Sequence, residues 1–341
     1  MNLLAAFPSD TIHCSCGKIH KIQTRFVCVG NDELKNLPDI MKKSKLEGAG
    51  LLVYDCNTFE VAAREASDIL GSCNIPCEKI CFSGEHVHAD AFHLKELQEA
   101  AQKYSPSWMI AVGSGSINDL VKLTAHRLSI PYLVIATSAS MDGYLSANAA
   151  IFEDGIKKQY LNLNPPVAAI ADTNVLYHAP REMTRAGLGD ALGKFTSLTE
   201  WKLNHLLAGE FYCEQTAKLV EQEVQALLTA ADQDSPQFFA ALIKTLLITG
   251  TAMQMLGNST PASAGEHYFS HALDTHSCAV TGDVYASHGD QVALGTWKLL
   301  KLYRALDQDH IIHPDPERYS NHIRHWQEFG IDFSEIINGK I

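Results

Sequence analysis

Clustered positive charge is what this sequence most clearly lacks. Lysine and arginine number 27 against 39 aspartates and glutamates, so the formal net charge is −12 at pH 7. Binding to nucleic acid or to an anionic membrane surface depends on clustered basic side chains that release counterions, and no such run is present. These partners are therefore excluded as the main ones. An anionic ligand must be held by backbone N–H groups, by one or two basic side chains, or by a metal ion.

Long apolar runs and a disulfide pattern are also missing. Residues 1–10, MNLLAAFPSD, have neither the basic flank nor the longer apolar stretch of a signal peptide. No uninterrupted apolar run reaches the ~18 residues of a membrane span. The nine cysteines are an odd number scattered through the chain, which is typical of reduced thiols. We therefore expect a cytoplasmic protein without membrane insertion.

The chain has enough length and apolar content for two folded domains. It has 341 residues, of which 46% are hydrophobic and 19% charged. In the first half, short β-branched runs alternate with polar, helix-like stretches, which is typical of βαβ units on a parallel sheet. The expected strands are 25–30, 50–55, 79–84, 108–115, 132–137 and 167–172, with a hairpin of 148–152 and 157–161 around the turn Glu153-Asp154-Gly155.

After about residue 175 the pattern becomes helical. Long stretches such as 209–231 and 235–256 carry apolar residues at helical spacing, and no further strand pattern follows. We predict a nucleotide-binding α/β domain with a Rossmann-like parallel sheet over residues 1–173. An all-helical domain is predicted over residues 174–341.

A glycine-rich loop follows the fourth expected strand. Residues 113–116 read GSGS, between a buried strand and a helix over 117–128. Glycines let the backbone approach a pyrophosphate, and the N–H groups at a helix N-terminus attract it. The loop is not a GxGxxG fingerprint, because position 118 is Asn and the loop does not follow the first strand. The alternative is a tight turn without a ligand.

Polar residues follow two other strands. Asp55 ends the second strand, where a carboxylate can accept a hydrogen bond from a ribose hydroxyl, which would favour NAD over NADP. The alternative for Asp55 is a helix N-cap. The loop 137–143, TSASMDG, places three hydroxyls and the Asp142 carboxylate at the carboxyl edge of the sheet, where open α/β folds bind ligands. Its alternative is a polar turn.

Histidine and aspartate residues in the second half have metal-ligand types. His267, His271 and Asp274 lie at i, i+4 and i+7, on one face of a helix. Asp190, before an expected helix, and His288, at a helix end, could join His267 to give the one carboxylate and two imidazoles of a catalytic metal centre. Further histidines are available at His310, His313, His322 and His325, and the alternative for each is a surface or core histidine.

The segment CSCGKIH near the N-terminus has the shape of a metal knuckle. Cys14, Cys16 and His20 supply three metal-ligand types. No second CxxC or HxxxH lies nearby to complete a set of four ligands, so an ordinary turn is the alternative.

Taken together, several long segments resemble the sn-glycerol-1-phosphate dehydrogenases, within the iron-containing alcohol dehydrogenase and glycerol dehydrogenase superfamily. The segments that carry the resemblance are CSCGKIH (14–20), GSGSINDLVK (113–122), IPYLVIATSASMDGYLS (130–146), AGLGDALGKFTSLTEWKL (186–203), PASAGEHYFSH (261–271) and HGDQVALGT (288–296). The resemblance implies the iron-containing alcohol dehydrogenase (dehydroquinate-synthase-like) fold, with the active site in a cleft between an α/β and a helical domain.

The resemblance also implies an activity and site roles. It implies NAD(P)H-dependent interconversion of dihydroxyacetone phosphate and sn-glycerol 1-phosphate, one divalent metal ion, zinc or nickel, and a homo-oligomer. Asp190, His267 and His288 would bind the metal. The implied cofactor contacts are Asp55, Gly113, Gly115, Ser116, Asp119, Thr137, Ser138 and Ser146; the catalytic residues are His271, as proton relay, and Asp142; and the substrate contacts are Asp142, Lys122 and Lys194.

The chain departs from the family pattern near the expected metal site. Thr260 stands where the family usually has an arginine, and Ala272-Leu273-Asp274 replaces an aromatic residue followed by Trp-Glu or Leu-Glu. Arginine is a natural partner of a phosphate group. The missing arginine keeps open a glycerol or other polyol dehydrogenase, which needs no phosphate contact. Two further alternatives are a 3-dehydroquinate-synthase-like lyase and a non-enzymatic metal-binding or interaction protein.

Overall fold

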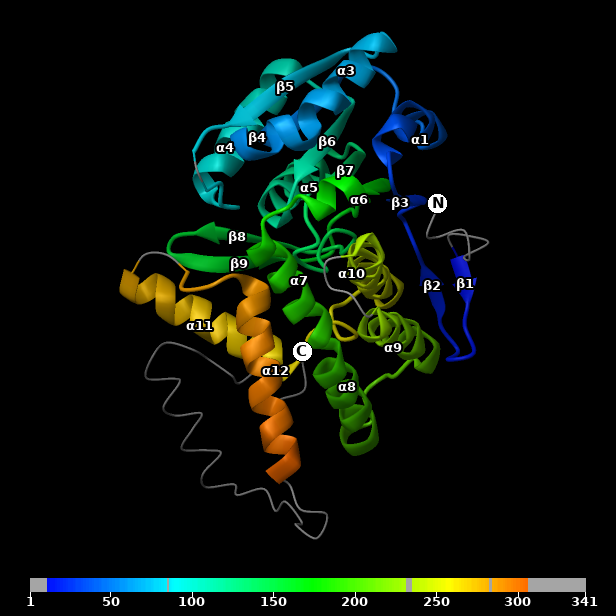
Figure 1. The fold of residues 1–341 in the computed structure, drawn as a ribbon, viewed down its shortest axis with the longest axis vertical. Coiled ribbons are helices and arrows are strands. Elements are labelled where there is room, and N and C mark those ends of the chain that lie inside the picture. Colours follow the sequence, from blue (N-terminus) through cyan, green and yellow to red (C-terminus); the bar gives the residue numbers. More distant parts are fainter. Residues whose placement is uncertain (1–10, 85, 231–234, 282–283, 306–341) are drawn as a thin grey trace. The chain divides into compact units, whose positions relative to one another are not determined.

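A six-stranded parallel sheet organises the first half of the chain (Figure 1). The computed structural model describes residues 11–84, 86–230, 235–281 and 284–305. The strands are β3 (Phe26–Gly30), β4 (Gly50–Asp55), β5 (Cys77–Phe82), β6 (Trp108–Gly113), β7 (Tyr132–Ala136) and β10 (Ala168–Asp172), in the spatial order β3-β10-β7-β6-β4-β5. Each predicted strand is present, with ends that differ by one or two residues.

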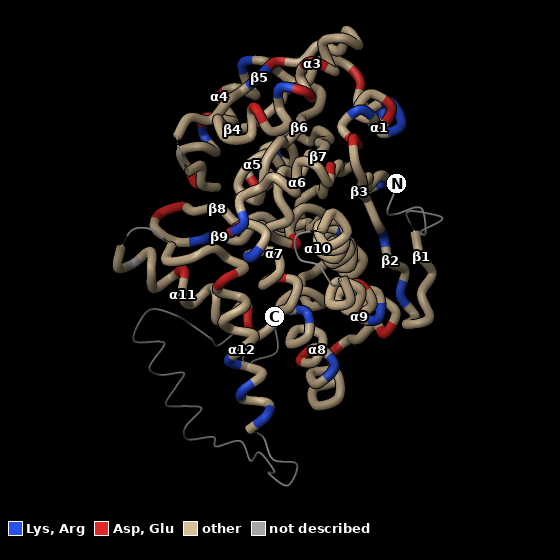
Figure 2. Tube along the Cα trace, viewed as in Figure 1, with Lys and Arg blue, Asp and Glu red and all other residues tan. Residues whose placement is uncertain are grey.

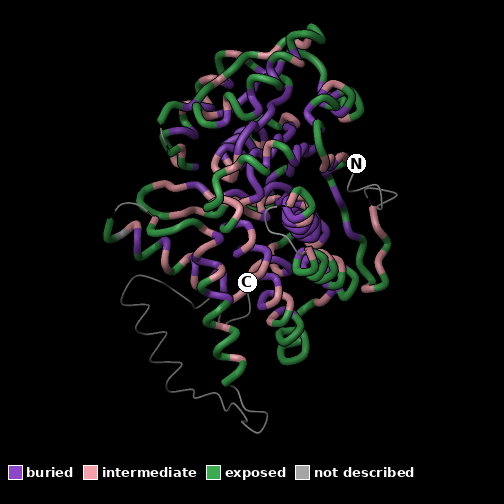
Figure 3. Tube along the Cα trace, in the orientation of Figure 1, coloured by how far each residue is buried: buried purple, intermediate pink, exposed green. Residues whose placement is uncertain are grey.

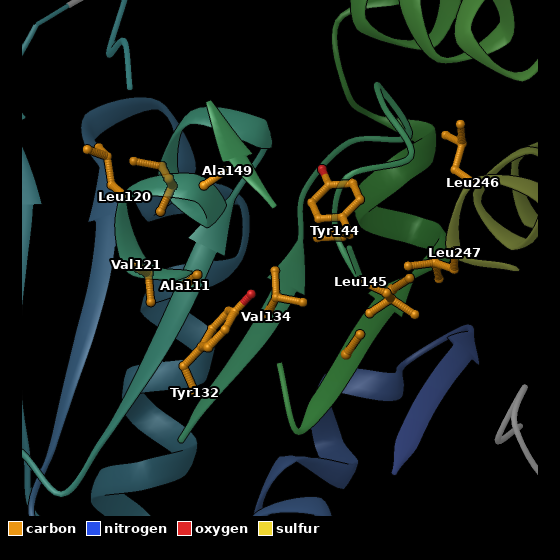
Figure 4. Close-up of a cluster of buried hydrophobic side chains, with 14 of the residues drawn as sticks. Ala111, Leu120, Val121, Tyr132, Val134, Tyr144, Leu145, Ala149, Leu246 and Leu247 are labelled. Carbon is orange, nitrogen blue, oxygen red and sulfur yellow. The ribbon is translucent and has the colours of Figure 1, made fainter. Parts of the chain in front are cut away.

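Both faces of the sheet are buried. The central strand β6 alternates between two hydrophobic cores: Met109 and Ala111 face one, and Ile110 and Val112 face the other. Helices α4 (Ala91–Tyr104) and α5 (Gly115–Leu128) contribute to the first core, part of which is shown in Figure 4. The second core includes α1 (Leu37–Lys43) and α3 (Arg64–Ser72), with the short helices η2 (Glu33–Asn36), α2 (Cys56–Thr58) and η3 (Phe59–Ala63) alongside. This is a doubly wound sheet, as predicted.

The connections leave two neighbouring strands towards opposite faces. The chain after β4 enters the core of α1 and α3, whereas the chain after β6 enters the core of α4 and α5. Between such strands a crevice opens at the carboxyl edge of a parallel sheet, and open α/β folds bind ligands there. Asp55 and Gly113 end these two strands.

Two small hairpins accompany the sheet. β8 (Ala149–Glu153) pairs with β9 (Ile156–Tyr160), and the turn between them has positive φ at Asp154 (56°) and Gly155 (78°), as a type I′ turn requires. This predicted hairpin is confirmed. The other hairpin, β1 (Thr11–His13) with β2 (Ile19–Lys21), was not expected from the sequence, because three-residue strands carry almost no alternation pattern.

Helices follow β10 in the described part of the chain. They are α6 (Thr173–Tyr177), α7 (Arg181–Leu192), α8 (Lys194–Ala208), α9 (Glu214–Thr229), α10 (Pro236–Leu256), α11 (Gly265–Thr281) and α12 (His288–Ala305). The predicted change from strands to helices is confirmed. The chain divides into two compact units after Leu300, and every site described below lies in the first unit.

Helix α10 is the core of the helical part. It is long and apolar enough to cross a membrane by length and composition, but 78% of its most apolar window is buried inside the protein (Figure 3). It packs on α9, α7, α6 and β2. A helix that is apolar on all sides is typical of a buried core helix.

Charged residues of both signs are interspersed along the described trace (Figure 2).

Candidate active site

A cavity of about 570 Å³ joins the carboxyl edge of the sheet to the helical part. The N-terminus of α5, the loop before β8, the hairpin strand β9 and the helices α11 and α12 all contribute to its wall. Residues of the sequence-based site that line it are Gly115, Ser116, Asp119, Asp142, Ser146, His267, His271 and His288; Lys157 and Thr260 line it as well. The cavity therefore unites the glycine-rich loop with the histidine cluster.

The α5 N-terminus is open towards a ligand. Ser114 is its N-cap and makes no side-chain capping hydrogen bond, and the next two residues, Gly115 and Ser116, line the cavity. Uncapped N–H groups and the helix dipole favour an anion at this place. Gly113 lies behind them, where a Cβ would come within 2.6 Å of Ile117 Cγ1, so close packing of the strand on the helix requires glycine there.

A buried lysine holds the loop beside α5. Lys122 Nζ donates hydrogen bonds to Gly143 O (2.8 Å) and Asn148 O (2.7 Å), and lies 3.2 Å from Ser146 Oγ. Its side chain is fully buried and is not among the residues that line the cavity. Asp119, 3.6 Å from Lys122, accepts a hydrogen bond from Ala150 N (3.0 Å), and burial raises the pKa of Asp119 against the effect of Lys122. These contacts favour a positioning role for Lys122.

A second buried lysine connects two carboxylates. Lys194 Nζ donates hydrogen bonds to Asp190 Oδ1 (2.7 Å) and Ala262 O (2.9 Å), and it forms an ion pair with Asp142 Oδ2 at 2.7 Å. Asp142 N also donates to Asp190 Oδ2 (2.8 Å). Burial and the neighbouring Asp190 raise the pKa of Asp142, although Lys194 lowers it. Of the three, only Asp142 is a described residue of the cavity wall.

Asp190 also belongs to a cluster of three side chains that could bind a metal ion. One ligand atom each of Asp190, His267 and His288 lies within 4.8 Å of the other two. His267 Nε2 is 3.6 Å from Asp190 Oδ1, close to the separation of about 3.4 Å expected between ligands bound at about 2.1 Å in a tetrahedral site. Burial alone would raise the pKa of Asp190, but Lys194 and both histidines outweigh it and lower the pKa to about 2.

Hydrogen bonds orient both histidines. His267 Nδ1 lies 2.8 Å from the buried Glu266 Oε1, so the ring donates there and leaves Nε2 facing Asp190. Ser270 Oγ donates its proton to Gln291 Oε1 (2.7 Å), so it can only accept at 3.2 Å from His288 Nδ1. His288 Nε2 is then unprotonated. Such partners are typical of metal-binding histidines.

This chain of partners continues to a cation in the cavity wall. Gln291 Nε2 donates to Asp274 Oδ1 (2.8 Å), and Asp274 Oδ2 lies 2.9 Å from Lys157 Nζ. Sequence reasoning missed Lys157, Glu266 and Gln291. A spacing of i, i+3 links Gln291 to His288, and this helical pattern was the signal available for it.

His271 lies one turn along α11 from His267, as the spacing predicts. It lines the cavity, and its ring centroid is 6.4 Å from that of His288. Burial, with the nearby Lys157 and His267, lowers the pKa of His271 to about 4. The imidazole is therefore neutral near pH 7, with one donor and one acceptor nitrogen.

The position of Asp190 corrects one expectation. Asp190, in the segment AGLGD, was expected to lie before a helix. Instead it lies within α7, where Gly187 and Gly189 allow close packing. A Cβ at Gly187 would lie 1.7 Å from Ala139 O, and one at Gly289 of α12 would lie 1.8 Å from Ala186 O. These contacts bring Asp190 against both the 137–143 loop and α12.

Four predicted cofactor residues lie at strand ends outside the described cavity wall: Asp55, Gly113, Thr137 and Ser138. Asp55 caps α2, with Oδ1 accepting from Thr58 N at 2.8 Å, so its alternative as an N-cap is what the structure contains. Thr137 N donates to Gly113 O (3.1 Å), and the fully buried Ser138 donates to Ser140 Oγ (3.0 Å). The four histidines at 310, 313, 322 and 325 lie outside the described residues.

Comparison with known proteins gives the chain its relatives. It is 35% identical to glycerol-1-phosphate dehydrogenase [NAD(P)+] from Pyrococcus abyssi, over 80% of this chain and 76% of that one. It is 34% identical to the enzyme of the same name from Thermococcus kodakarensis, over 82% and 78%. The chain belongs to the glycerol-1-phosphate dehydrogenase family.

The wider family and fold agree with this membership. A profile of the family described as iron-containing alcohol dehydrogenase matches residues 28–180. A probable glycerol dehydrogenase from Sinorhizobium meliloti 1021 shares the fold, with a TM-score of 0.66 and 20% identity over 92% of this chain and 84% of that one. The predicted family and fold class are thereby confirmed.

Thr260, which stands where the family usually has an arginine, lies on the wall of the candidate active-site cavity. Thr260 lines the wall in the turn before α11, where its N–H donates to Asn258 Oδ1 (3.1 Å). Lys157 is on the same wall and its side chain is 21% exposed, whereas Lys122 and Lys194 are fully buried. Lys157 is thus the lysine that the described wall offers to a ligand.

Proposed function

We propose that this protein is a metal-dependent NAD(P)H oxidoreductase that interconverts dihydroxyacetone phosphate and sn-glycerol 1-phosphate. The observation that supports it most is the single cavity that contains both an open helix N-terminus and the cluster of Asp190, His267 and His288. The names of the relatives point to the same activity.

The donor set fits a divalent metal ion. One carboxylate and two imidazoles, with both Nδ1 atoms engaged by Glu266 and Ser270, leave the two Nε2 atoms and one carboxylate oxygen to bind zinc or nickel. When bound, such an ion supplies Lewis-acid stabilisation of charge on a carbonyl or alcohol oxygen of the substrate. Lys194 holds Asp190 in place, and its positive charge offsets part of the negative charge of Asp190 and Asp142.

The remaining roles follow from position in the cavity. NAD(P)H supplies the hydride, and its pyrophosphate is proposed to bind at Gly115 and Ser116. The other proposed cofactor contacts are Asp119 and Ser146 on the cavity wall and Gly113, Thr137 and Ser138 at the strand ends. Asp55, whose Oδ1 caps α2, is proposed to accept a hydrogen bond from a ribose hydroxyl. His271 is proposed to pass a proton between the substrate oxygen and water as a neutral imidazole. Asp142, on the cavity wall, is proposed to lie beside the nicotinamide and to contact the substrate. Lys122 and Lys194 are proposed to act through these neighbours.

The substrate phosphate is proposed to bind near Lys157. A phosphomonoester carries close to two negative charges near neutral pH, and Thr260 supplies none of the positive charge of the family's usual arginine. Lys157 places an ammonium group on the cavity wall, and this group also forms an ion pair with Asp274. The same substitution keeps a polyol dehydrogenase as the second candidate function.

A substrate screen separates these functions. Metal-free protein is reconstituted with zinc or nickel and mixed with NADH or NADPH and either dihydroxyacetone phosphate or dihydroxyacetone. We expect the phosphorylated substrate to have the higher kcat/KM and chelation to abolish turnover reversibly. Equal or higher kcat/KM for dihydroxyacetone would favour the polyol dehydrogenase. Steady NAD(P)H consumption would exclude the lyase, which has no net cofactor turnover.

Three general properties stay predictions. The domains 1–173 and 174–341 are proposed as the folding halves around the cavity. A homo-oligomer is proposed as the assembly, which light scattering of the purified protein tests. Cytoplasmic localisation is proposed, and fractionation of cells tests it.

A further inference from the structure

A second cluster of metal-ligand side chains lies away from the described wall of the active-site cavity. It consists of Cys14, Cys16 and His20, from the hairpin β1–β2 and its turn, and Cys213, the N-cap of α9. Cys213 is 199 residues from Cys14 in sequence, and their Sγ atoms are 3.6 Å apart. Cys213 therefore supplies the fourth ligand, which the N-terminal segment by itself lacks.

All four ligand atoms lie within 4.8 Å of one another, and three of their separations can be compared with a tetrahedral site. Cys16 Sγ lies 3.3 Å and Cys213 Sγ 3.4 Å from His20 Nε2. With Zn–S bonds of about 2.3 Å and Zn–N bonds of about 2.05 Å, tetrahedral geometry requires S···S separations of about 3.8 Å and S···N separations of about 3.6 Å. The observed separations lie within about 0.3 Å of these values.

Neighbouring groups prepare the donors for a cation. His20 is 1% exposed, and its Nδ1 lies 2.7 Å from Met255 O, which can only accept a hydrogen bond. Nδ1 therefore carries the proton and Nε2 directs its lone pair at the sulfurs. Thr216 Oγ1 donates to Cys213 Sγ at 3.2 Å, a contact that stabilises a thiolate.

The knuckle itself has the required backbone. Gly17 has φ of +84°, a conformation that favours glycine, and its N–H donates to Cys14 O at 3.1 Å. Cys14 N also donates to Lys18 O (3.1 Å). This tight turn brings the two sulfurs of CxC and the following histidine to one side.

We propose that Cys14, Cys16, His20 and Cys213 bind a structural zinc ion. Three thiolates and an imidazole are a common tetrahedral zinc set, and soft sulfur ligands favour zinc over hard cations such as magnesium. All four positions are occupied by protein ligands, so this site has no open position for a substrate. Its consequence is mechanical: the ion ties the N-terminal hairpin to the start of α9 and, through His20, to the end of α10.

Cobalt substitution tests this site independently of the enzyme activity. Protein produced in zinc-depleted, cobalt-supplemented medium is expected to show a thiolate-to-cobalt charge-transfer band and intense visible bands of tetrahedral cobalt. The proposed catalytic ligands contain no sulfur, so they cannot produce that charge-transfer band. Cys213→Ser should lose the band, while Cys73→Ser, at an exposed cysteine of α3's C-cap, should keep it. Absence of the band in the unaltered protein, or its full retention in Cys213→Ser, would overturn the proposal.

A second measurement needs no variant and covers the case in which Cys213→Ser does not fold. Zinc release from the unaltered, EDTA-treated protein is followed with a metal-sensitive dye while a mercurial reagent modifies the thiols. One equivalent of zinc released with thiol modification supports the site. The contrary results are release of no zinc, or a loss of two titratable thiols in denatured, unreduced protein, which would indicate a Cys14–Cys213 disulfide instead.

Discussion

Lys194 is a fully buried lysine whose charge stabilises two neighbouring carboxylates. Its ammonium group is the shared partner of Asp190 and Asp142, both largely buried. Removing one partner of a buried ion pair leaves uncompensated charge and costs about 3–5 kcal/mol. We expect Lys194→Met to lower the free energy of unfolding of the metal-free protein by roughly this amount, measured by urea denaturation. Lys218→Met, at an exposed pair on α9, is the control and should change little. Equal stability of both variants would contradict the argument.

Lys157 gives the test of substrate recognition at the same scale. Loss of a charge-assisted contact with a phosphate typically weakens binding by about 1.5–3 kcal/mol, or roughly 10- to 100-fold. Lys157→Met should raise KM for dihydroxyacetone phosphate by this factor and change KM for dihydroxyacetone much less. The next residue of β9 supplies a matched control, because Lys158 is more exposed and pairs with Glu153 and Asp154. The same KM increase for both substrates would show that Lys157 supports the wall rather than the phosphate.

At the scale of elements, contact between α7 and α12 decides whether the metal ligands meet. Gly289 follows His288, and a Cβ there would lie 1.8 Å from the backbone atom Ala186 O. Gly289→Ala must therefore separate the helices that carry Asp190 and His288. We expect at least a tenfold loss of affinity for the catalytic metal, measured by competition with a chelating dye. Gly71→Ala in α3, where a Cβ meets nothing within 4 Å, should retain the metal; retention in both variants would contradict the role of the contact.

The N-terminus of α5 allows the corresponding test for the cofactor. At Gly115 a Cβ would lie 3.4 Å from the flexible Met141 side chain, so the fold accommodates a larger residue. The branched side chain of a valine at position 115 would occupy the space in front of the first N–H groups of α5, where the pyrophosphate is proposed to bind. Gly115→Val should weaken NADH binding by tenfold or more in fluorescence titrations, with metal content unchanged. Unaltered NADH affinity would place the dinucleotide elsewhere.

Across the whole first unit, Gln254 joins parts that are distant in sequence. From α10 its amide accepts from Gln23 N (2.9 Å) and donates to Thr24 Oγ1 (2.8 Å) and Leu145 O (2.5 Å). Gln254→Leu would remove these hydrogen bonds, and each buried group left unpaired costs about 1–3 kcal/mol if water does not replace the amide. We expect the free energy of unfolding to fall by about 2–4 kcal/mol. Gln102→Leu, on the exposed side of α4, should change it little. A comparable loss in both variants would contradict the linking role.

Much of this molecule follows from local sequence patterns. β-Branched runs, the Asp154-Gly155 turn and the helical spacing of His267 and His271 each depend on residues close in the chain, and the structure contains them where they were expected. Local conformational preference and the need to bury one face act over a few residues, so they are visible without tertiary contacts.

The remaining features depend on contacts between distant segments. Asp190 was expected before a helix, yet it lies within α7, where Ala139 and α12 pack against the glycines of AGLGD. Cys213 becomes a partner of Cys14 only when the start of α9 reaches the N-terminal hairpin. Lys122 and Lys194 have the charge of substrate contacts, but burial engages their protons with carbonyl and carboxylate oxygens, and Lys157 is left on the cavity wall. Long-range packing sets which polar groups are enclosed together, and a linear pattern contains no record of those distances.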